Sequence, residues 1–215
     1  MKFKIQDKIV VLDEVFLMQD RIIIIDFGAP DVVDMAGIIT QFDIKCQIKT
    51  NNITADWIKK QQDIKGIILS GGPSSMRFAS APVVDIEIFN LSIPILGICY
   101  GCEMMNTLLG GKMMKREILE KGVYKLELTE QSTLLKDTPI NQNVYMDHID
   151  QVDLMPIGFQ SLASTQSCPV AAMQNLERNL FAVQFHPEKG KTTYGQQILR
   201  NFVFEICGCT PKQKN

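Results

Sequence analysis

One cysteine of the chain lies in a sequence that could make it a nucleophile. Cys99 is the centre of Gly97-Ile98-Cys99-Tyr100-Gly101, at the end of an apolar run. Glycines two residues to either side leave room for a tight strand-to-helix turn that exposes the central side chain. The following helix would favour thiolate over thiol, and the Tyr100 N–H could stabilise an oxyanion. The motif indicates nucleophilic chemistry, with a buried structural cysteine as the plainer alternative.

A histidine and a carboxylate two residues apart could supply the base for this nucleophile. His186 and Glu188 follow the apolar run from Phe181 to Gln184, and Pro187 lies between them. Histidine can accept the thiol proton and later protonate the leaving group, because its pKa suits both steps. A nearby carboxylate can fix the imidazole tautomer. Taken alone, however, this short motif is weak and is more often part of an ordinary loop.

A glycine-rich turn follows another expected strand, at Leu69-Ser70-Gly71-Gly72-Pro73. Such a turn exposes backbone N–H groups and allows a ligand to approach closely. The phosphate-binding pattern that ends in Lys-Ser or Lys-Thr is absent from this segment. A plain tight turn remains the alternative.

Two other groupings admit different chemistry. His148 lies between Asp147 and Asp150, which could indicate a metal site, but too few further ligands are in view to favour one. Cys99 and Cys102 are spaced as a redox pair, which would require a thioredoxin-like context. We therefore predict no metal site in this chain.

The elements that must position these residues alternate between strands and helices. Ile22 to Ile25 is an unbroken β-branched run, typical of a strand buried on both faces. We expect a helix ending at Phe42, a strand at 45–48, a helix at 53–60 capped by Thr54, strands at 66–69 and 93–98, and a helix through Leu109. This alternation predicts an α/β fold with a parallel sheet between helices, with ligands beyond the carboxyl ends of the strands.

The second half of the chain has a different pattern. We expect strands at 123–128, 144–146, 171–174 and 181–185, and a final helix at 194–205. Residues 1–20 read as an N-terminal extension, in which 9–12 could form a strand. Residues 21–209 then form one domain, and 210–215 a C-terminal tail.

Composition excludes several classes of protein. A content of 46% hydrophobic and 21% charged residues allows a packed core, and the net charge of -2 gives no reason to expect nucleic acid or an anionic membrane. No run approaches the roughly 20 apolar residues of a membrane span, and the N-terminus lacks a secretory signal. The six cysteines are irregularly spaced, which favours a reduced, cytoplasmic protein.

Taken together, the motifs resemble those of the class I glutamine amidotransferases, and most closely the amidotransferase portion of GMP synthase. The resemblance covers roughly residues 22–209. The matching segments are Ile24 to Gly28, Leu69 to Pro73, Pro94 to Gly101, Leu109 to Lys112, Gln184 to Glu188, and Asn201-Phe202 with Ile206 to Cys209. The family fold is a three-layer, flavodoxin-like domain with a mixed, mostly parallel sheet.

The resemblance implies roles for particular residues. Cys99 would be the nucleophile, His186 the acid and base, and Glu188 the residue that orients it. The N–H groups of Gly72 and Tyr100 would form the oxyanion hole. The substrate glutamine would be bound by residues from three segments, namely Gly71, Glu103, Asp147, His148 and Ile149.

The sequence departs from the family pattern around the expected substrate. The family has glutamine four residues after the nucleophile, whereas this chain has Glu103. A carboxylate there would repel the α-carboxylate of glutamine and attract its α-ammonium group. The family sequence Ser-His-Gly-Asp is here Asp147 to Asp150, with β-branched Ile149 in place of glycine. The family sequence Gly-Ser-Gln-Tyr is Gly28 to Asp31.

The resemblance also implies a partner. The family passes its ammonia to an ATP-pyrophosphatase that converts xanthosine monophosphate to GMP, so ATP and Mg²⁺ would belong to that partner and no cofactor to this chain. Three readings stay open: a glutaminase serving such a synthetase, a hydrolase of the same fold acting on another γ-glutamyl substrate, and a regulatory protein with a degraded site.

Overall fold

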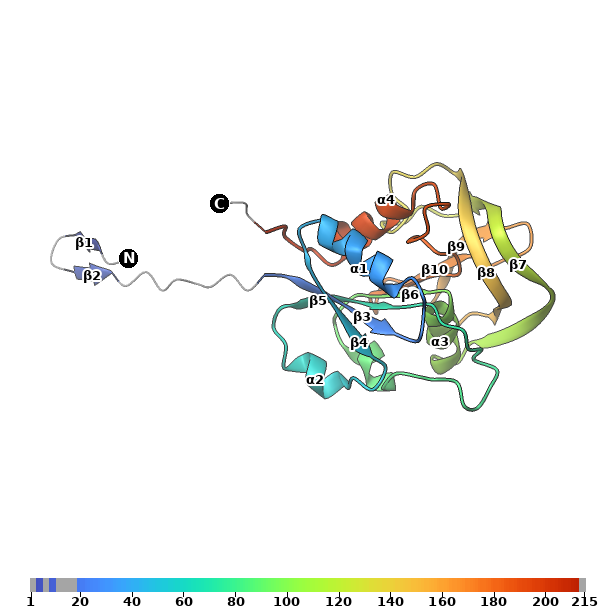
Figure 1. The fold of residues 1–215 in the computed structure, drawn as a ribbon, viewed down its shortest axis with the longest axis horizontal. Helices are drawn as coiled ribbons and strands as arrows, with labels where there is room; N and C mark the ends of the chain where they lie inside the picture. Colours follow the sequence, from blue (N-terminus) through green and yellow to red (C-terminus); the bar gives the residue numbers. More distant parts are fainter. Residues whose placement is uncertain (1–2, 6–7, 11–18, 213–215) are drawn as a thin grey trace.

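The computed structural model describes residues 3–5, 8–10 and 19–212, and nine strands within them form one sheet (Figure 1). These strands are β3 (Arg21–Asp26), β4 (Lys45–Thr50), β5 (Ile64–Leu69), β6 (Ile95–Ile98), β7 (Lys112–Leu128), β8 (Asn141–Leu154), β9 (Gln160–Thr165), β10 (Ala172–Asn175) and β11 (Leu180–Val183). Across the sheet they follow the order β4-β3-β5-β6-β11-β10-β9-β7-β8. Two further strands, β1 (Phe3–Ile5) and β2 (Lys8–Val10), form a separate antiparallel pair.

The sheet has a parallel half and an antiparallel half. Parallel pairing joins β4, β3, β5, β6 and β11. Antiparallel pairing joins β11 to β10, β9, β7 and β8 in turn. In the parallel half the first strand lies between the second and the third, which is the flavodoxin-like order. The α/β fold with a mixed sheet is therefore confirmed.

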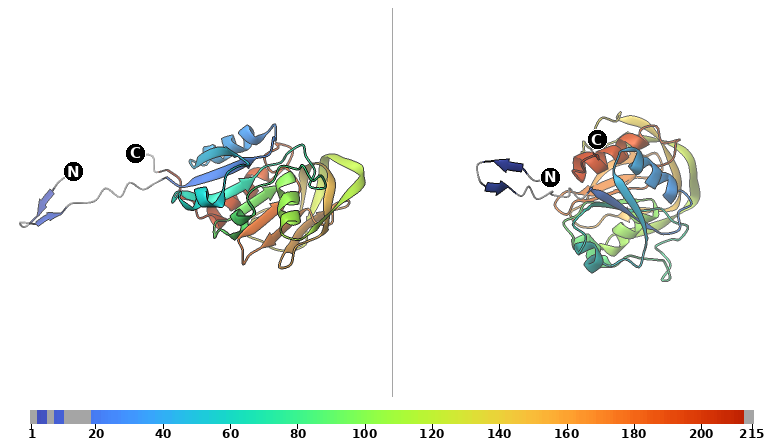
Figure 2. Two further views of the ribbon diagram at one scale, coloured as in Figure 1. Left: turned by 90° about the horizontal axis from the view of Figure 1, so that it is seen from below. Right: turned by 60° about the vertical axis from the view of Figure 1, so that its left-hand side comes forward.

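The isoleucines of β3 explain why helices cover both faces of the sheet. Ile22 and Ile24 pack into one apolar cluster and Ile23 and Ile25 into a second, because successive side chains of a strand point to opposite faces. The first face is covered by α1 (Val32–Gln41), α4 (Gly195–Arg200) and the π-helical turn η2 (Asn201–Ile206). The second is covered by α2 (Ala55–Lys59), the 3-10 helix η1 (Ile86–Asn90) and α3 (Tyr100–Leu108). Figure 2 shows the resulting three layers from two further sides.

Most predicted elements are present, with shifted bounds. The predicted cap of α2 is confirmed, since Thr54 accepts a hydrogen bond from the Trp57 N–H at 3.2 Å. The antiparallel half differs more from expectation. The strands β7 and β8 extend far beyond 123–128 and 144–146, while β9 and η1 are not predicted at all. A register shift between Lys115 and Glu120 interrupts β7, which explains why its alternating pattern is hard to recognise.

The two ends of the described domain meet. The Thr210 N–H donates to Asp20 Oδ2 at 2.8 Å, so the segment before β3 contacts the C-terminal tail. Of the strand suggested at 9–12, residues 9 and 10 belong to β2, whereas 11 and 12 lie outside the described residues. Among the described residues, no helix has the length and apolar character needed to cross a membrane.

The parallel strands place the chemical motifs at one edge of the sheet. β5 ends immediately before Ser70, and β6 ends immediately before Cys99. β11 ends at Val183, three residues before His186. Their ends are tied together, since the Phe27 N–H after β3 donates to Ser70 Oγ at 3.0 Å. Segments that are distant in the sequence therefore converge at the carboxyl edge, as predicted.

Candidate active site

Cys99 occupies the turn between β6 and α3. Its backbone has a φ of 52°, a conformation that residues with a side chain rarely adopt. Two hydrogen bonds fix the turn: the Cys99 N–H donates to the Val183 carbonyl at 2.9 Å, and the Gly101 N–H donates to the Ser70 carbonyl at 3.1 Å. The sharp strand-to-helix turn predicted from the glycine spacing is therefore present.

His186 is fixed by backbone and side-chain contacts from two elements. Its N–H donates to the carbonyl of Tyr145 in β8 at 2.9 Å. The Thr192 hydroxyl donates to the His186 carbonyl at 2.7 Å and accepts from the Tyr145 N–H at 3.0 Å. Glu188 Oε1 lies 2.6 Å from His186 Nδ1. The carboxylate thus holds a proton on Nδ1 and leaves Nε2 available for contact with another group.

The imidazole of His186 lies beside Cys99. His186 Nε2 is buried and has no hydrogen-bond partner among the described residues, and the imidazole interacts electrostatically with the thiol of Cys99. Gly71 shows how close the two side chains are. A Cβ atom added at Gly71 would lie 3.3 Å from His186 Cε1 and 3.7 Å from Cys99 Cβ. The structure therefore brings Cys99, His186 and Glu188 together as the sequence predicts.

Burial and mutual contact set the protonation of this pair. Burial raises the pKa of the Cys99 thiol, the His186 hydrogen bond and charge lower it, and the charges of Glu103 and Glu188 raise it further. For His186, burial alone would lower the pKa, but the hydrogen bonds and charges of Cys99 and Glu188 raise it to about 10. The sequence pattern predicts that the helix favours the thiolate. The net rise in the pKa of Cys99 shows that the helix dipole alone does not ionise the thiol. Because each side chain shifts the pKa of the other, Cys99 and His186 titrate together.

A cavity of about 510 Å³ opens beside Cys99. Its lining includes every residue predicted to contact the substrate or its oxyanion, namely Gly71, Gly72, Tyr100, Glu103, Asp147, His148 and Ile149, together with Cys99 and His186. Tyr100 is the first residue of α3, so its N–H has no carbonyl partner within the helix. The cavity can therefore accept an acyl group beside a nucleophile, a base and a free backbone donor.

The segment 147–150 of β8 forms one wall of this cavity. The Asp147 carbonyl lies 3.7 Å from Cys99 Sγ, and the Asp147 carboxylate pairs with Lys121 at 3.0 Å. The His148 side chain is buried. Its Nδ1 lies within hydrogen-bonding distance of the Asp150 carbonyl, at 2.7 Å, and its Nε2 pairs with the Glu120 carboxylate, also at 2.7 Å. No group of three or more potential metal-binding side chains occurs in the described part of the chain.

Several residues of the site are not predicted from the sequence. Arg77 Nε donates to Asp150 Oδ1 at 2.7 Å, and the Ser75 hydroxyl donates to the other oxygen of Asp150. Glu120 lies opposite His148 in the β7–β8 register, which positions their ion pair. These contacts join residues far apart in the sequence, and the residue types alone carry no signal for them.

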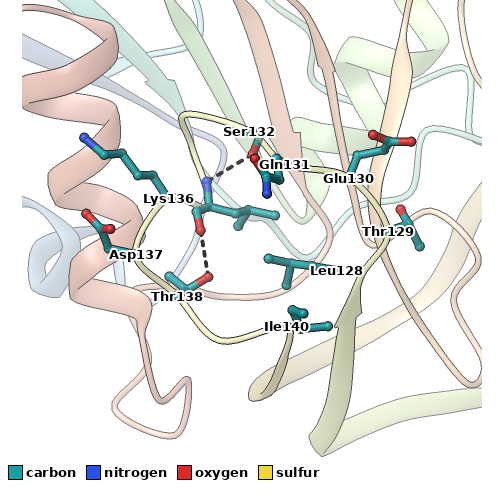
Figure 3. A pocket seen from close by; sticks show the side chains of 10 residues that line it. Leu128, Thr129, Glu130, Gln131, Ser132, Lys136, Asp137, Thr138 and Ile140 are labelled. Carbon is teal, nitrogen blue, oxygen red and sulfur yellow. Dashed lines mark hydrogen bonds between the residues drawn. The ribbon is translucent and has the colours of Figure 1, made fainter.

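A second cavity, of about 490 Å³, lies away from these groups (Figure 3). Its ten lining residues fall within 128–140, between β7 and β8. Ser132 Oγ accepts from the Leu135 N–H at 3.1 Å, and Thr138 Oγ1 donates to the Leu135 carbonyl at 2.8 Å. These polar groups stabilise the turn itself, and the lining contains no cysteine or histidine. The chemistry therefore belongs to the cavity beside Cys99.

Comparison with known sequences gives one consistent family. The family model "Glutamine amidotransferase class-I" matches residues 23–206. GMP synthase (glutamine-hydrolyzing) of Caldanaerobacter subterraneus subsp. tengcongensis is 42% identical over 194 residues, which cover 90% of this chain and 38% of that protein. The enzyme of the same name from Lactiplantibacillus plantarum is 44% identical over 190 residues, which cover 87% of this chain and 36% of that protein. The chain thus spans little more than a third of these relatives.

A solved structure gives the same result. The crystal structure of a protein from Thermoplasma acidophilum, described as one subunit of a GMP synthase, superposes with a TM-score of 0.77 and 25% sequence identity. The superposition covers 88% of this chain and 94% of that one. The whole domain, and not only its motifs, is therefore shared.

The turn that carries His186 and Glu188 depends on close packing at Gly195. A Cβ atom at Gly195 would lie 1.9 Å from the Pro187 carbonyl oxygen, whereas one at Gly190 would meet no atom within 4 Å. We predict that Gly195→Ala displaces this turn, lowers the free energy of unfolding by about 1–3 kcal/mol and lowers kcat of the reaction at this site.

Gly190→Ala in the same turn is the matched control and should change neither quantity appreciably. Thermal unfolding and steady-state kinetics of the two variants check this prediction. Equal behaviour of the two variants would contradict a positional role for the packing at Gly195.

Proposed function

The chain belongs to the class I glutamine amidotransferases, and from this we propose that it hydrolyses glutamine to glutamate and ammonia through a thioester on Cys99. The proposal rests mainly on one observation. Cys99 and His186 line one cavity, the imidazole interacts with the thiol, and Glu188 holds His186 Nδ1 at 2.6 Å. A structural cysteine would not require a base held in this way.

The first half of the reaction forms the thioester. His186 Nε2 takes the proton of the Cys99 thiol, and the sulfur attacks the γ-carbonyl carbon of glutamine. The carbonyl oxygen becomes an oxyanion, which the N–H groups of Tyr100 and Gly72 would stabilise. His186 then returns the proton to the amide nitrogen, the C–N bond breaks and ammonia leaves.

The second half releases glutamate. His186 takes a proton from water, and the hydroxide attacks the thioester carbon. The C–S bond breaks, glutamate departs and the proton returns to Cys99. Glu188 keeps its hydrogen bond to Nδ1 throughout and stabilises the imidazolium that forms in each half. The proposed steps use protein groups and water alone.

The ammonia would serve a synthetase. We propose an ATP-pyrophosphatase partner that converts xanthosine monophosphate to GMP, with ATP and Mg²⁺ bound by that partner. The names of the matched relatives support this, since they are GMP synthases and, in the solved structure, a single GMP synthase subunit. All six cysteines are free thiols, which supports a reduced, cytoplasmic location.

The nucleophile can be identified by comparing two buried cysteines of one segment. Cys99 lines the cavity, whereas Cys102 is buried on α3 and outside the cavity lining. We predict that Cys99→Ala abolishes ammonia release from glutamine and that Cys102→Ala retains most of it. The assay is enzymatic detection of ammonia with both variants verified as folded. Equal loss in both variants would favour a redox pair over a single nucleophile.

The partner can be tested separately. We predict that the chain alone releases ammonia from glutamine, because Cys99 and His186 already line one cavity without a partner. An ATP-pyrophosphatase subunit, with ATP, Mg²⁺ and xanthosine monophosphate, should increase this rate and yield GMP. Glutamine hydrolysis that never supports GMP formation would contradict the proposed partner but not the glutaminase.

If γ-glutamyl peptides are cleaved in preference to glutamine, the alternative substrate class is correct. Absence of any hydrolysis, with folded protein, would favour a regulatory role.

A further inference from the structure

Glu103 is a buried carboxyl group in the wall of the active-site cavity. It lies one helical turn after the nucleophile, and its N–H donates to the Cys99 carbonyl at 3.0 Å. Its side chain lines the cavity, although only 4% of the residue is exposed. A carboxylate in such a place loses most of its hydration, which favours the neutral acid over the ion.

The nearest partner of Glu103 is an amide. Gln184 Nε2 donates to Glu103 Oε1 at 3.2 Å, and Gln184 is fully buried. The other amide atom, Gln184 Oε1, is buried and has no hydrogen-bond donor among the described residues. A protonated Glu103 can supply that donor, because a carboxylic acid offers one O–H and one carbonyl oxygen.

The charges around Glu103 also favour the neutral form. The charge of Asp150 in β8 disfavours ionisation of Glu103, and Arg77, whose charge opposes this effect, already binds Asp150 at 2.7 Å. The charge of Glu103 also acts on the thiols of Cys99, Cys102 and Cys168 and on the hydroxyl of Tyr100. The other titratable residues that line the same cavity are Asp31, Lys115, Asp147, His148, His186 and Lys189. Burial, and then Asp150, raise the pKa of Glu103 to about 8, against smaller opposing effects of Gln184 and Arg77.

We propose that Glu103 takes part in glutamine recognition as a neutral carboxylic acid, paired with the Gln184 amide, and that glutamine binding weakens when Glu103 loses its proton. This inference rests on the proposed function, and it names a residue that determines specificity for the substrate. The family pattern has a glutamine residue at the position of Glu103. The side-chain amide of that residue offers a donor and an acceptor, and a neutral carboxylic acid offers both as well.

Ionisation would disturb the site in two ways. The Glu103 carboxylate has only acceptors, so it would face the buried Gln184 Oε1 without a proton between them. It would also place a negative charge in a desolvated wall that receives the α-carboxylate of an amino acid. Gln184 lies two residues before His186, so the loss of the pair also affects the segment that carries the base.

The expected pH dependence follows from the neutral fraction. With a pKa of about 8, Glu103 is mostly neutral at pH 7 and mostly ionised at pH 9. The apparent affinity for glutamine falls in proportion to the fraction of protein in which Glu103 is neutral. Glutamine should therefore bind roughly tenfold more weakly at pH 9 than at pH 7. The α-ammonium group of glutamine also titrates in this range, so a reference protein without Glu103 is needed.

The test measures glutamine binding without turnover. Cys99→Ala prevents thioester formation, and the double variant Cys99→Ala with Glu103→Gln is the matched reference. Calorimetric titration of the full chain with glutamine is carried out at pH 7 and pH 9, in two buffers of different ionisation enthalpy. Relative to the reference, Cys99→Ala should lose about tenfold in affinity at pH 9 and take up about one additional proton on binding.

Two results would overturn the proposal. Equal pH dependence and equal proton uptake in both proteins would exclude a role for the Glu103 proton. Tighter binding to Cys99→Ala at pH 9 would mean that the carboxylate holds the α-ammonium group. Absence of glutamine binding to either protein at both pH values would instead contradict the proposed function itself.

A second measurement does not depend on the Glu103 variant. In Cys99→Ala with carbon-13 at the glutamate side-chain carboxyls, one carboxyl signal should titrate near pH 8 in the absence of glutamine. If every glutamate carboxyl titrates in the usual acidic range, the neutral acid does not exist and the proposal fails.

Discussion

The turn between β6 and α3 holds the backbone of Cys99 at a φ of 52°, a conformation that costs on the order of 1–3 kcal/mol for a residue with a side chain. The surrounding sheet must supply this free energy. It does so through the hydrogen bonds of the turn to Val183 and Ser70, which belong to the neighbouring strand ends on either side. This backbone conformation places the Cys99 thiol at the cavity, with the Tyr100 N–H following it in the chain.

The mixed sheet makes the second half of the site possible. β11 closes the parallel half and begins the antiparallel half, so its end lies beside β6 while the loop beyond it reaches β8. Tyr145 of β8 and Thr192 then fix the backbone of His186. His186 is therefore positioned by both halves of the sheet, whereas the turn that carries Cys99 depends on the parallel half.

The sequence predicts the parts of the site that depend on local geometry. The glycines around Cys99 and the short His186–Glu188 spacing are such features, as are the buried runs that form the parallel strands. The extents of β7 and β8 are not predictable in this way, because the shift between Lys115 and Glu120 breaks their alternation. The pairs Glu120–His148 and Arg77–Asp150 depend on that register and on a long loop. They appear only when the chain is folded.

Glu103 is predictable from the sequence only in part. Its departure from the family pattern is visible in the sequence, but its effect depends on Gln184 and Asp150, which only the fold brings to it. The protonation state of the Cys99 thiol is likewise predictable only in part. A helix N-terminus suggests a thiolate, yet burial raises the pKa of Cys99, and the hydrogen bond and charge of His186 oppose that rise.

The proposed chemistry depends on one covalent step, in which Cys99 forms a thioester with the γ-acyl group of glutamine. The most direct test is rapid acid quenching of the protein during turnover, followed by intact-mass and peptide mass spectrometry. We expect a glutamyl adduct on the peptide that contains Cys99, which hydroxylamine removes. Steady ammonia release with no adduct, or an adduct on another cysteine, would contradict this mechanism.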